Sequence, residues 1–123
     1  MRNTDSVITV FVVDDEPLYA DAHARMLPQY EVETAYSVEA ALELVDETID
    51  VLLIDRRMPA LSGDDVVRAL ESQDVDCRTI FVSTVNPERD RVSVAVDGYL
   101  TKPVTKRQLG DYIDHVLGRR TRP

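Results

Sequence analysis

Five short apolar stretches alternate with segments of helical pattern, and this alternation limits the folds that are open to the chain. The expected strands cover residues 8–13, 31–35, 51–54, 79–83 and 98–101. The first and third are apolar almost throughout, as is typical of strands covered on both faces. Strand–helix alternation with short connections predicts an α/β domain with helices on both faces of a parallel sheet. For five strands, the doubly wound order 2-1-3-4-5 is the common precedent.

Polar residues mark the starts of the helices expected between these strands. Ser37 and Ser62 are candidate N-caps, and the spacing from Thr105 to Gln108 fits a capping box. Pro17 suits a first helical turn, directly after the acidic residues that end the first strand. These signals predict where the helices begin.

The first helix has an apolar stripe at helical spacing. Leu18, Ala22 and Met26 recur four residues apart along it. His23 on this helix and His115 near the end of the chain are expected to face solvent, away from the acidic residues. Neither histidine is expected to bind a metal or a phosphoryl group.

The composition restricts the partners of the chain. Its 123 residues suffice for one domain with a proper core. With 23 acidic and 14 basic residues its net charge is -9, which opposes direct nucleic-acid binding. Aspartate is in excess and only two basic residues are lysines, a composition similar to that of proteins from salt-loving archaea. An ordinary acidic cytosolic protein is the alternative.

The apolar runs, the single cysteine and the last residues of the chain lead to further expectations. The sequence contains no run of 18 apolar residues and no signal peptide, so a cytoplasmic protein without a membrane span is expected. The single cysteine, Cys77, forms no internal disulfide and fits a reducing compartment. Gly118 is a helix-stop signal, which puts the domain at residues 1–118. Residues 119–123 are either a basic tail or the start of a linker to a downstream domain.

Acidic, hydroxyl and basic side chains stand where the expected strands end. Asp14 and Asp15 follow the first strand and Asp55 follows the third. Ser83 ends the fourth strand, and Lys102 follows the fifth. Ligands of open parallel sheets bind at the carboxyl ends of the strands. We therefore expect these five side chains to converge on one small site.

Three converging carboxylates indicate a divalent cation. Like charges raise each other's pKa unless something neutralises them, and a hard cation with oxygen ligands does so. Mg²⁺ fits two or three aspartates, and Mn²⁺ is an alternative. Asp14 and Asp15 alone would fit a helix cap, but a cap does not explain Asp55. Asp55 is a candidate nucleophile for a phosphoryl group, with Lys102 as its cationic partner and Ser83 as a hydroxyl donor.

Five short motifs together resemble the receiver domain of response regulators in two-component signalling. They are residues 12–16 (VVDDE), 55–59 (DRRMP), 61–63 (LSG), 81–83 (FVS) and 99–103 (YLTKP). All occur in order and with suitable spacing, so the resemblance covers residues 8–117 and implies a flavodoxin-like fold. Residues 56–64 also resemble receivers that precede a haloarchaeal output domain.

The resemblance assigns a metal site and an acceptor. Asp55 would accept a phosphoryl group from a sensor histidine kinase or a phosphotransfer protein. Asp15 and Asp55 would bind Mg²⁺ directly, with the backbone carbonyl of Arg57 as a third ligand. Asp14 would act mainly through metal-bound water. Such a domain is a switch that promotes its own phosphorylation and dephosphorylation. It would not be an enzyme that turns over a diffusible substrate.

The resemblance also assigns the groups that hold the phosphoryl oxygens. Ser83 and Lys102 would do so, with the backbone N–H groups of Arg56 and Thr84. The peptide bond between Lys102 and Pro103 would be cis.

Tyr99 would be the aromatic switch residue, moving inward together with Ser83. The face formed by a helix within residues 86–97, the strand 98–101 and the last helix would change, controlling an output domain, a partner or a homodimer. Ser83 and Lys102 are only 19 residues apart, fewer than is usual in this family, so the helix within 86–97 is expected to be short.

Three other readings stay open. A phosphatase of the haloacid-dehalogenase type also uses an aspartyl nucleophile, but it has an Asp-x-Asp motif after its first strand. A flavin-binding module would need a phosphate-binding loop where this chain has Asp14 to Pro17. A receiver-like interaction module that is never phosphorylated would share the fold and the site, and Mg²⁺ titration would separate it.

Overall fold

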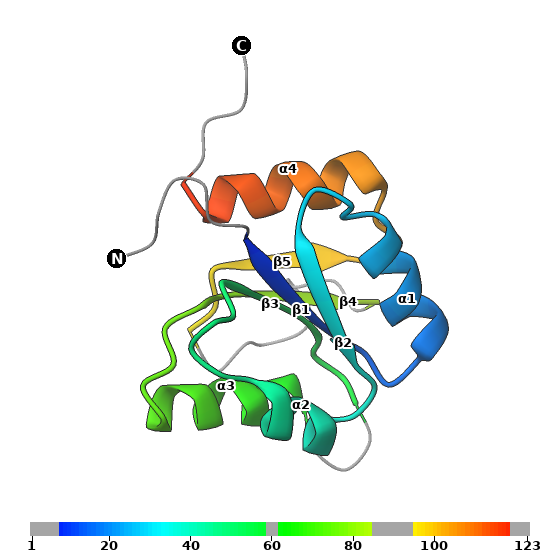
Figure 1. Cartoon of the computed structure of the whole chain (residues 1–123). Coiled ribbons are helices and arrows are strands. Elements are labelled where there is room, and N and C mark those ends of the chain that lie inside the picture. The colour runs from blue at the N-terminus through cyan, green and yellow to red at the C-terminus, as the bar shows by residue number, and fades with distance from the viewer. Residues whose placement is uncertain (1–7, 59–61, 85–94, 119–123) are drawn as a thin grey trace.

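Strands and helices follow one another in the order that the sequence predicts. The computed structural model describes residues 8–58, 62–84 and 95–118 (Figure 1). The elements are β1 (Thr9–Val13), α1 (Pro17–Arg25), β2 (Glu31–Ala35), α2 (Val38–Leu44), β3 (Val51–Asp55), α3 (Gly63–Ser72), β4 (Arg78–Ser83), β5 (Gly98–Thr101) and α4 (Lys106–Val116). Most of the short helix expected within residues 86–97 lies outside the described residues. None of the helices in the described ranges is long and apolar enough to cross a membrane.

All five strands belong to one parallel sheet in the order β2-β1-β3-β4-β5, which confirms the predicted topology. The register brings the strand ends level with one another. Val13 pairs with Ile54, so Asp14 and Asp55 follow at the same height. Ser83 pairs with Thr101, so Lys102 begins just beyond the end of β4.

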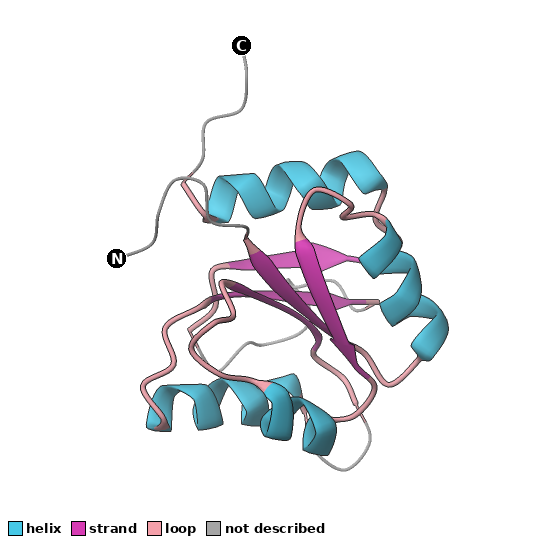
Figure 2. Cartoon of the chain, in the orientation of Figure 1, coloured by secondary structure: helices cyan, strands magenta, loops and turns pink. Residues whose placement is uncertain are grey.

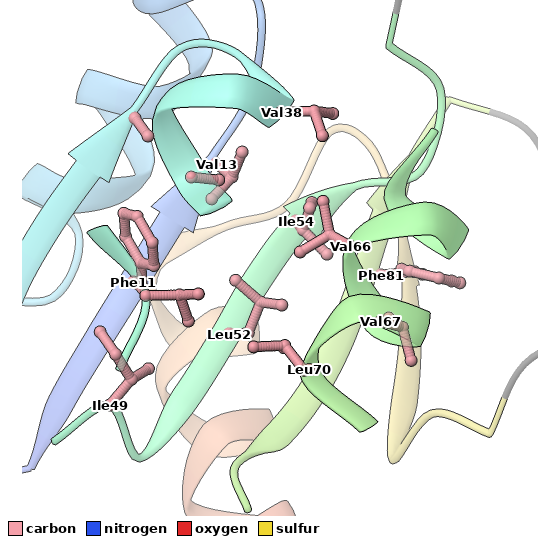
Figure 3. Close-up of a cluster of buried hydrophobic side chains, with 13 residues drawn as sticks. Phe11, Val13, Val38, Ile49, Leu52, Ile54, Val66, Val67, Leu70 and Phe81 are labelled. Carbon is pink, nitrogen blue, oxygen red and sulfur yellow. The ribbon is translucent and has the colours of Figure 1, made fainter. Parts of the chain in front are cut away.

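Helices cover both faces of the sheet, with α1 and α4 on one side and α2 and α3 on the other (Figure 2). Each side has its own apolar core, and Figure 3 shows the core under α2 and α3. Successive strand residues point to opposite faces, so Leu52 and Ile54 enter this core while Val51 and Leu53 enter the other. This explains why β3 is apolar at every position but its last.

The apolar stripe of α1 lies only partly against the core. Leu18 is 82% exposed, whereas Met26 packs against the core on this side of the sheet. Ala20 and His23 on α1, and Leu27 just after it, are buried. The expectation that His23 faces solvent is wrong, because only 5% of this residue is exposed. His115 is exposed, as predicted.

The predicted helix starts are confirmed. The Ser37 hydroxyl accepts a hydrogen bond of 3.0 Å from the backbone N–H of Ala40. Thr105 and Gln108 form a reciprocal capping box, with bonds of 2.9 and 3.1 Å. Gly118 follows α4 with a φ of 75°, a left-handed conformation in which glycine is favoured.

The start of α3 is held tightly against the end of β3. The N–H of Gly63 donates to the carbonyl of Arg56 at 2.8 Å. A Cβ on Gly63 would lie 3.0 Å from the Arg56 Cα, 3.1 Å from the Asp55 carbonyl oxygen and 3.2 Å from Phe81 Cε1. Two of these neighbours are backbone atoms and have little room to move. Gly63 therefore sets how closely α3 approaches the loop after Asp55.

We expect Gly63→Ala to lower the free energy of unfolding by about 1–3 kcal/mol, because the added methyl group overpacks this junction. The matched control is Gly110→Ala within α4, where the added Cβ meets only the end of the Gln29 side chain at 3.3 Å. That change should raise stability by about 0.5–1 kcal/mol, the usual gain of alanine over glycine inside a helix. Urea unfolding in high salt measures both. Equal effects of the two changes would contradict the proposed crowding at Gly63.

Candidate functional site

Three carboxylates converge at the carboxyl end of the sheet. Asp14, Asp15 and Asp55 each offer an oxygen within 4.8 Å of the others. They come from the ends of β1 and β3, which are neighbours in the sheet. Oxygen ligands in such a cluster fit a hard divalent cation that keeps several waters, as Mg²⁺ does.

Lys102 brings a positive charge to this cluster. Its Nζ lies 2.7 Å from Asp14 Oδ2 and 3.3 Å from Asp55 Oδ2, and only 6% of its side chain is exposed. Its backbone N–H donates to the carbonyl of Ser83 at 2.8 Å, which fixes it beside the end of β4. The expected cis peptide bond between Lys102 and Pro103 is present. The structure thus joins residues that are 88 positions apart in the sequence.

Asp14 accepts hydrogen bonds from two neighbouring residues. Its Oδ1 accepts the backbone N–H of Glu16 at 3.0 Å, while its Oδ2 accepts a hydrogen bond from Lys102. Glu16 is the N-cap residue of α1 and makes no capping bond with its own side chain. Asp14 Oδ1 therefore caps the start of α1. This cap does not account for the other carboxylates of the acidic cluster.

Burial and nearby positive charge shift the pKa of Asp55 in opposite directions. Burial raises the pKa of this carboxyl, while the backbone N–H of Arg57 and the nearby Lys102 act to lower it, and the net pKa is raised. The Arg57 N–H donates to Asp55 Oδ1 at 3.0 Å. For Lys102, burial alone would lower the pKa, but the hydrogen bond to Asp14 and the charges of both aspartates outweigh it, so its pKa is raised. A divalent cation would compete with the proton for Asp55.

The remaining predicted residues surround this centre. Ser83 is buried at the end of β4, and Thr84 after it is exposed. Tyr99 is half-buried on β5 and meets the ring of Phe81 edge-on, with centroids 6.2 Å apart and an interplanar angle of 89°. The backbone groups of Arg56, Arg57 and Thr84 keep their expected roles as predictions.

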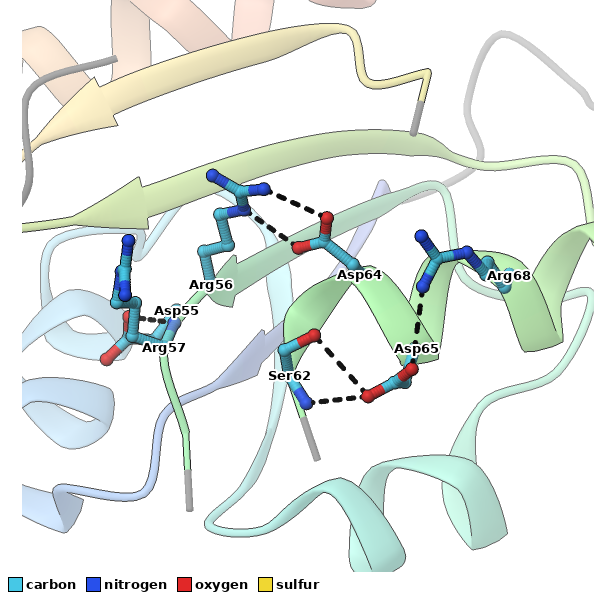
Figure 4. Close-up of polar contacts among 7 residues, drawn as sticks. All are labelled: Asp55, Arg56, Arg57, Ser62, Asp64, Asp65 and Arg68. Carbon is cyan, nitrogen blue, oxygen red and sulfur yellow. Dashed lines mark hydrogen bonds and ion pairs between the residues drawn. The ribbon is translucent and has the colours of Figure 1, made fainter. Parts of the chain in front are cut away.

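An ion pair that sequence reasoning missed connects the loop after Asp55 to α3. Arg56 Nε lies 2.8 Å from Asp64 Oδ1, and a second guanidinium nitrogen lies 3.1 Å from Oδ2 (Figure 4). Only 11% and 8% of the two side chains are exposed. The Arg56 guanidinium also lies 5.7 Å from the centroid of the Phe81 ring. In the sequence Asp64 is simply an acidic residue in a first helical turn, so nothing indicated this partner.

Two side chains of α1 also approach the site unexpectedly. The Tyr19 ring lies over Lys102 Nζ, 4.2 Å from ring centroid to nitrogen. His23 stacks against Tyr19, with centroids 6.5 Å apart. Tyr19 lies in the first turn of α1, directly after the acidic residues that end β1, and this nearness in the sequence was the signal that could have placed it beside the strand ends.

A cavity of about 730 Å³ opens beside the carboxylates. Its described lining is Asp15, Arg56, Arg57, Met58, Ser62, Asp64 and Arg68. It gives Asp15, and with it the candidate cation site, an approach from solvent.

Comparison with protein families and curated proteins places this arrangement among known relatives. The family model described as the response regulator receiver domain matches residues 10–114. A provisionally named transcriptional regulator of Haloferax volcanii is 40% identical over 112 residues, which are 89% of this chain and 19% of that protein. The transcriptional regulatory protein CutR of Streptomyces coelicolor is 36% identical over 118 residues, which are 91% of this chain and 54% of that protein. The chain thus spans about half or less of the length of these relatives.

Solved structures show the same fold. The chemotaxis response regulator CheY4 of Vibrio cholerae has a TM-score of 0.78 at 27% identity, covering 90% of this chain and 99% of that chain. The response regulator TrrA of Thermotoga maritima, solved in complex with Mg²⁺ and BeF, has a TM-score of 0.77 at 26% identity, covering 89% and 98%. The expected flavodoxin-like fold and the resemblance to receivers, haloarchaeal ones included, are confirmed.

Asp64→Asn should lower the free energy of unfolding by about 3 kcal/mol, because it leaves a largely buried guanidinium without its charged partner. Arg68→Ala is the matched control, since the Arg68–Asp65 pair is 3.5 Å apart and about half exposed. That control should stay within about 0.5 kcal/mol of the wild type. Urea unfolding measures both. A double-mutant cycle with Arg56→Met that shows no coupling would contradict the importance of the pair.

The pKa of His23 is lowered, first by burial and then by the charge of Lys102, from its ordinary value of 6.5. As the pH falls below 6.5, the unfolded chain takes up this proton before the folded protein does. Stability that is fully present above pH 6.5 is therefore lost as the pH falls through the lowered pKa. His23→Gln should reduce the loss of stability between about pH 7.5 and about pH 5.

The control for this pH dependence is His115→Gln, which changes an exposed imidazole on α4. This variant should keep the wild-type dependence of stability on pH. Urea unfolding at both pH values compares the three proteins, and identical slopes for His23→Gln and the wild type would contradict the role of His23.

Proposed function

Because the chain belongs to the response regulator receiver family, we propose that it is a phosphorylatable signalling switch whose acceptor is Asp55. The phosphoryl group comes from a phosphohistidine of a sensor histidine kinase or a phosphotransfer protein. The observation that carries the proposal is the convergence of Asp14, Asp15 and Asp55 with Lys102 at the carboxyl edge of the sheet. The domain acts on itself and not on a diffusible substrate.

Asp55 supplies the attacking oxygen. Its carboxylate oxygen forms a bond to phosphorus as the bond from phosphorus to the donor nitrogen breaks, and the donor histidine keeps that electron pair. Lys102 Nζ, which lies 3.3 Å from Asp55 Oδ2, moves one hydrogen bond from the carboxylate to a phosphoryl oxygen. The Ser83 hydroxyl and the backbone N–H groups of Arg56 and Thr84 hold the other oxygens. The cavity beside Asp15 leaves an approach to the site.

Mg²⁺ would be held by Asp15, Asp55 and the backbone carbonyl of Arg57, with Asp14 acting through water. Bound there, the cation neutralises charge on the phosphoryl oxygens. Mn²⁺ takes the same kind of oxygen ligands and is expected to replace it. The three clustered carboxylates support this assignment.

Ser83 and Tyr99 would transmit the effect of phosphorylation to the surface of the domain. When Ser83 moves toward the phosphoryl group, Tyr99 turns inward, and the face made by residues 86–97, β5 and α4 changes. The contact of Tyr99 with Phe81 on β4 supports such coupling. This face would control an output domain or a partner protein, or form a homodimer. The longer relatives, which are named as regulators of transcription, support an output of that kind. We place the domain in the cytoplasm, with residues 119–123 as a tail or linker.

Asp55→Asn tests the acceptor. With Mg²⁺ and acetyl phosphate in high salt, or with a kinase if acetyl phosphate fails, the wild type should gain one phosphate by intact mass and the variant none. Asp46→Asn changes a fully exposed aspartate away from the site and should gain the phosphate as the wild type does. Chelation of Mg²⁺ should abolish the gain. Mg²⁺ binding without any gain from either donor would instead indicate a receiver fold used as an unphosphorylated binding module.

A further inference from the structure

The surroundings of the Lys102 ammonium group divide into an acidic side and an aromatic side. Asp14 and Asp55 accept its hydrogen bonds at 2.7 and 3.3 Å. The Tyr19 ring faces it with the centroid 4.2 Å from Nζ. This distance is well within the roughly 6 Å over which an aromatic face attracts a cation. We propose that Tyr19 is a positioning residue for Lys102, holding the ammonium group at the acceptor site through the face of its ring.

An aromatic face suits a lysine that has to change partners. The ring attracts the cation but offers its face no hydrogen-bond acceptor, so it does not tie the ammonium group to a fixed oxygen. The ring lies over a cation whose side chain is only 6% exposed, and attraction between charges is stronger where water is excluded. Lys102 can therefore exchange an Asp55 oxygen for a phosphoryl oxygen without leaving its place.

The helix under Tyr19 supports this role. His23, one turn further along α1, stacks on the Tyr19 ring at an interplanar angle of 29° and is itself buried. The adjacent Leu18 is 82% exposed. Burial lowers the pKa of His23, which disfavours a second cation beside the ring. The Tyr19 ring thus packs against a buried neighbour on α1, while Leu18 offers an adjacent apolar side chain that is largely exposed.

The first test reads the position of Lys102 directly and needs no phosphorylation. Lys102 and the exposed Lys106 are the two lysines of the chain, so peptide mass after labelling with acetic anhydride compares a covered amine with an internal reference. Tyr19→Leu should raise labelling of Lys102 relative to Lys106 by about fivefold, because the aliphatic side chain cannot replace the cation–π contact. Tyr19→Phe should keep the protection, and Leu18→Ala should match the wild type.

The second test measures the consequence for the acceptor reaction, and it rests on the proposed function. The rate of phosphate gain with acetyl phosphate and Mg²⁺ should fall about fivefold in Tyr19→Leu and stay near the wild-type rate in Tyr19→Phe. Circular dichroism confirms that each variant is folded.

The outcomes separate the two proposals. Wild-type labelling of Lys102 in Tyr19→Leu, or a loss of protection in Tyr19→Phe equal to that in Tyr19→Leu, overturns the role of the ring. An unchanged rate in Tyr19→Leu, when the wild type takes up phosphate, overturns it as well. Absence of phosphate gain in the wild type counts against the proposed function alone, because the labelling result still decides whether Tyr19 positions Lys102.

Discussion

The contact of Lys102 with Asp14 and Asp55 is the interaction on which the site depends. Three carboxylates within 4.8 Å of one another repel, and the lysine offsets part of that charge from inside the protein. The parallel register makes the contact possible, because it sets the ends of four adjacent strands at one height. The oxygen ligands of this cluster are compatible with a divalent cation, which in the proposed function would supply the remaining compensation.

The junction between β3 and α3 connects Asp55 to the rest of the domain. Gly63 lets the helix approach the backbone of Arg56, and the Arg56–Asp64 ion pair closes the same junction from the side-chain direction. The guanidinium then faces Phe81, which meets Tyr99 edge-on. The loop after Asp55 is therefore linked to the ring of the proposed switch residue through Phe81.

Helix α1 contributes to the site as well as to the core. Its inner face buries Ala20 and His23, while its first turn places Tyr19 over the ammonium group of Lys102. Asp14 accepts a hydrogen bond from the backbone at the helix start, so the position of α1 is coupled to the acidic cluster. Helix placement and the surroundings of the lysine consequently depend on each other.

The elements, their caps and the strand ends that bear the acidic residues were predictable from the amino-acid sequence, because strand periodicity, capping and turn chemistry are local. The family was predictable as well, through motifs that keep their order, and the strand order followed from precedent. The burial of His23 and the exposure of Leu18 on α1 depended on packing, since both positions fit a helical period. The tertiary structure also decided the partners of Arg56 and Tyr19. Those contacts depend on how a helix and a loop sit against the sheet, and long-range packing, which no local pattern encodes, sets that placement.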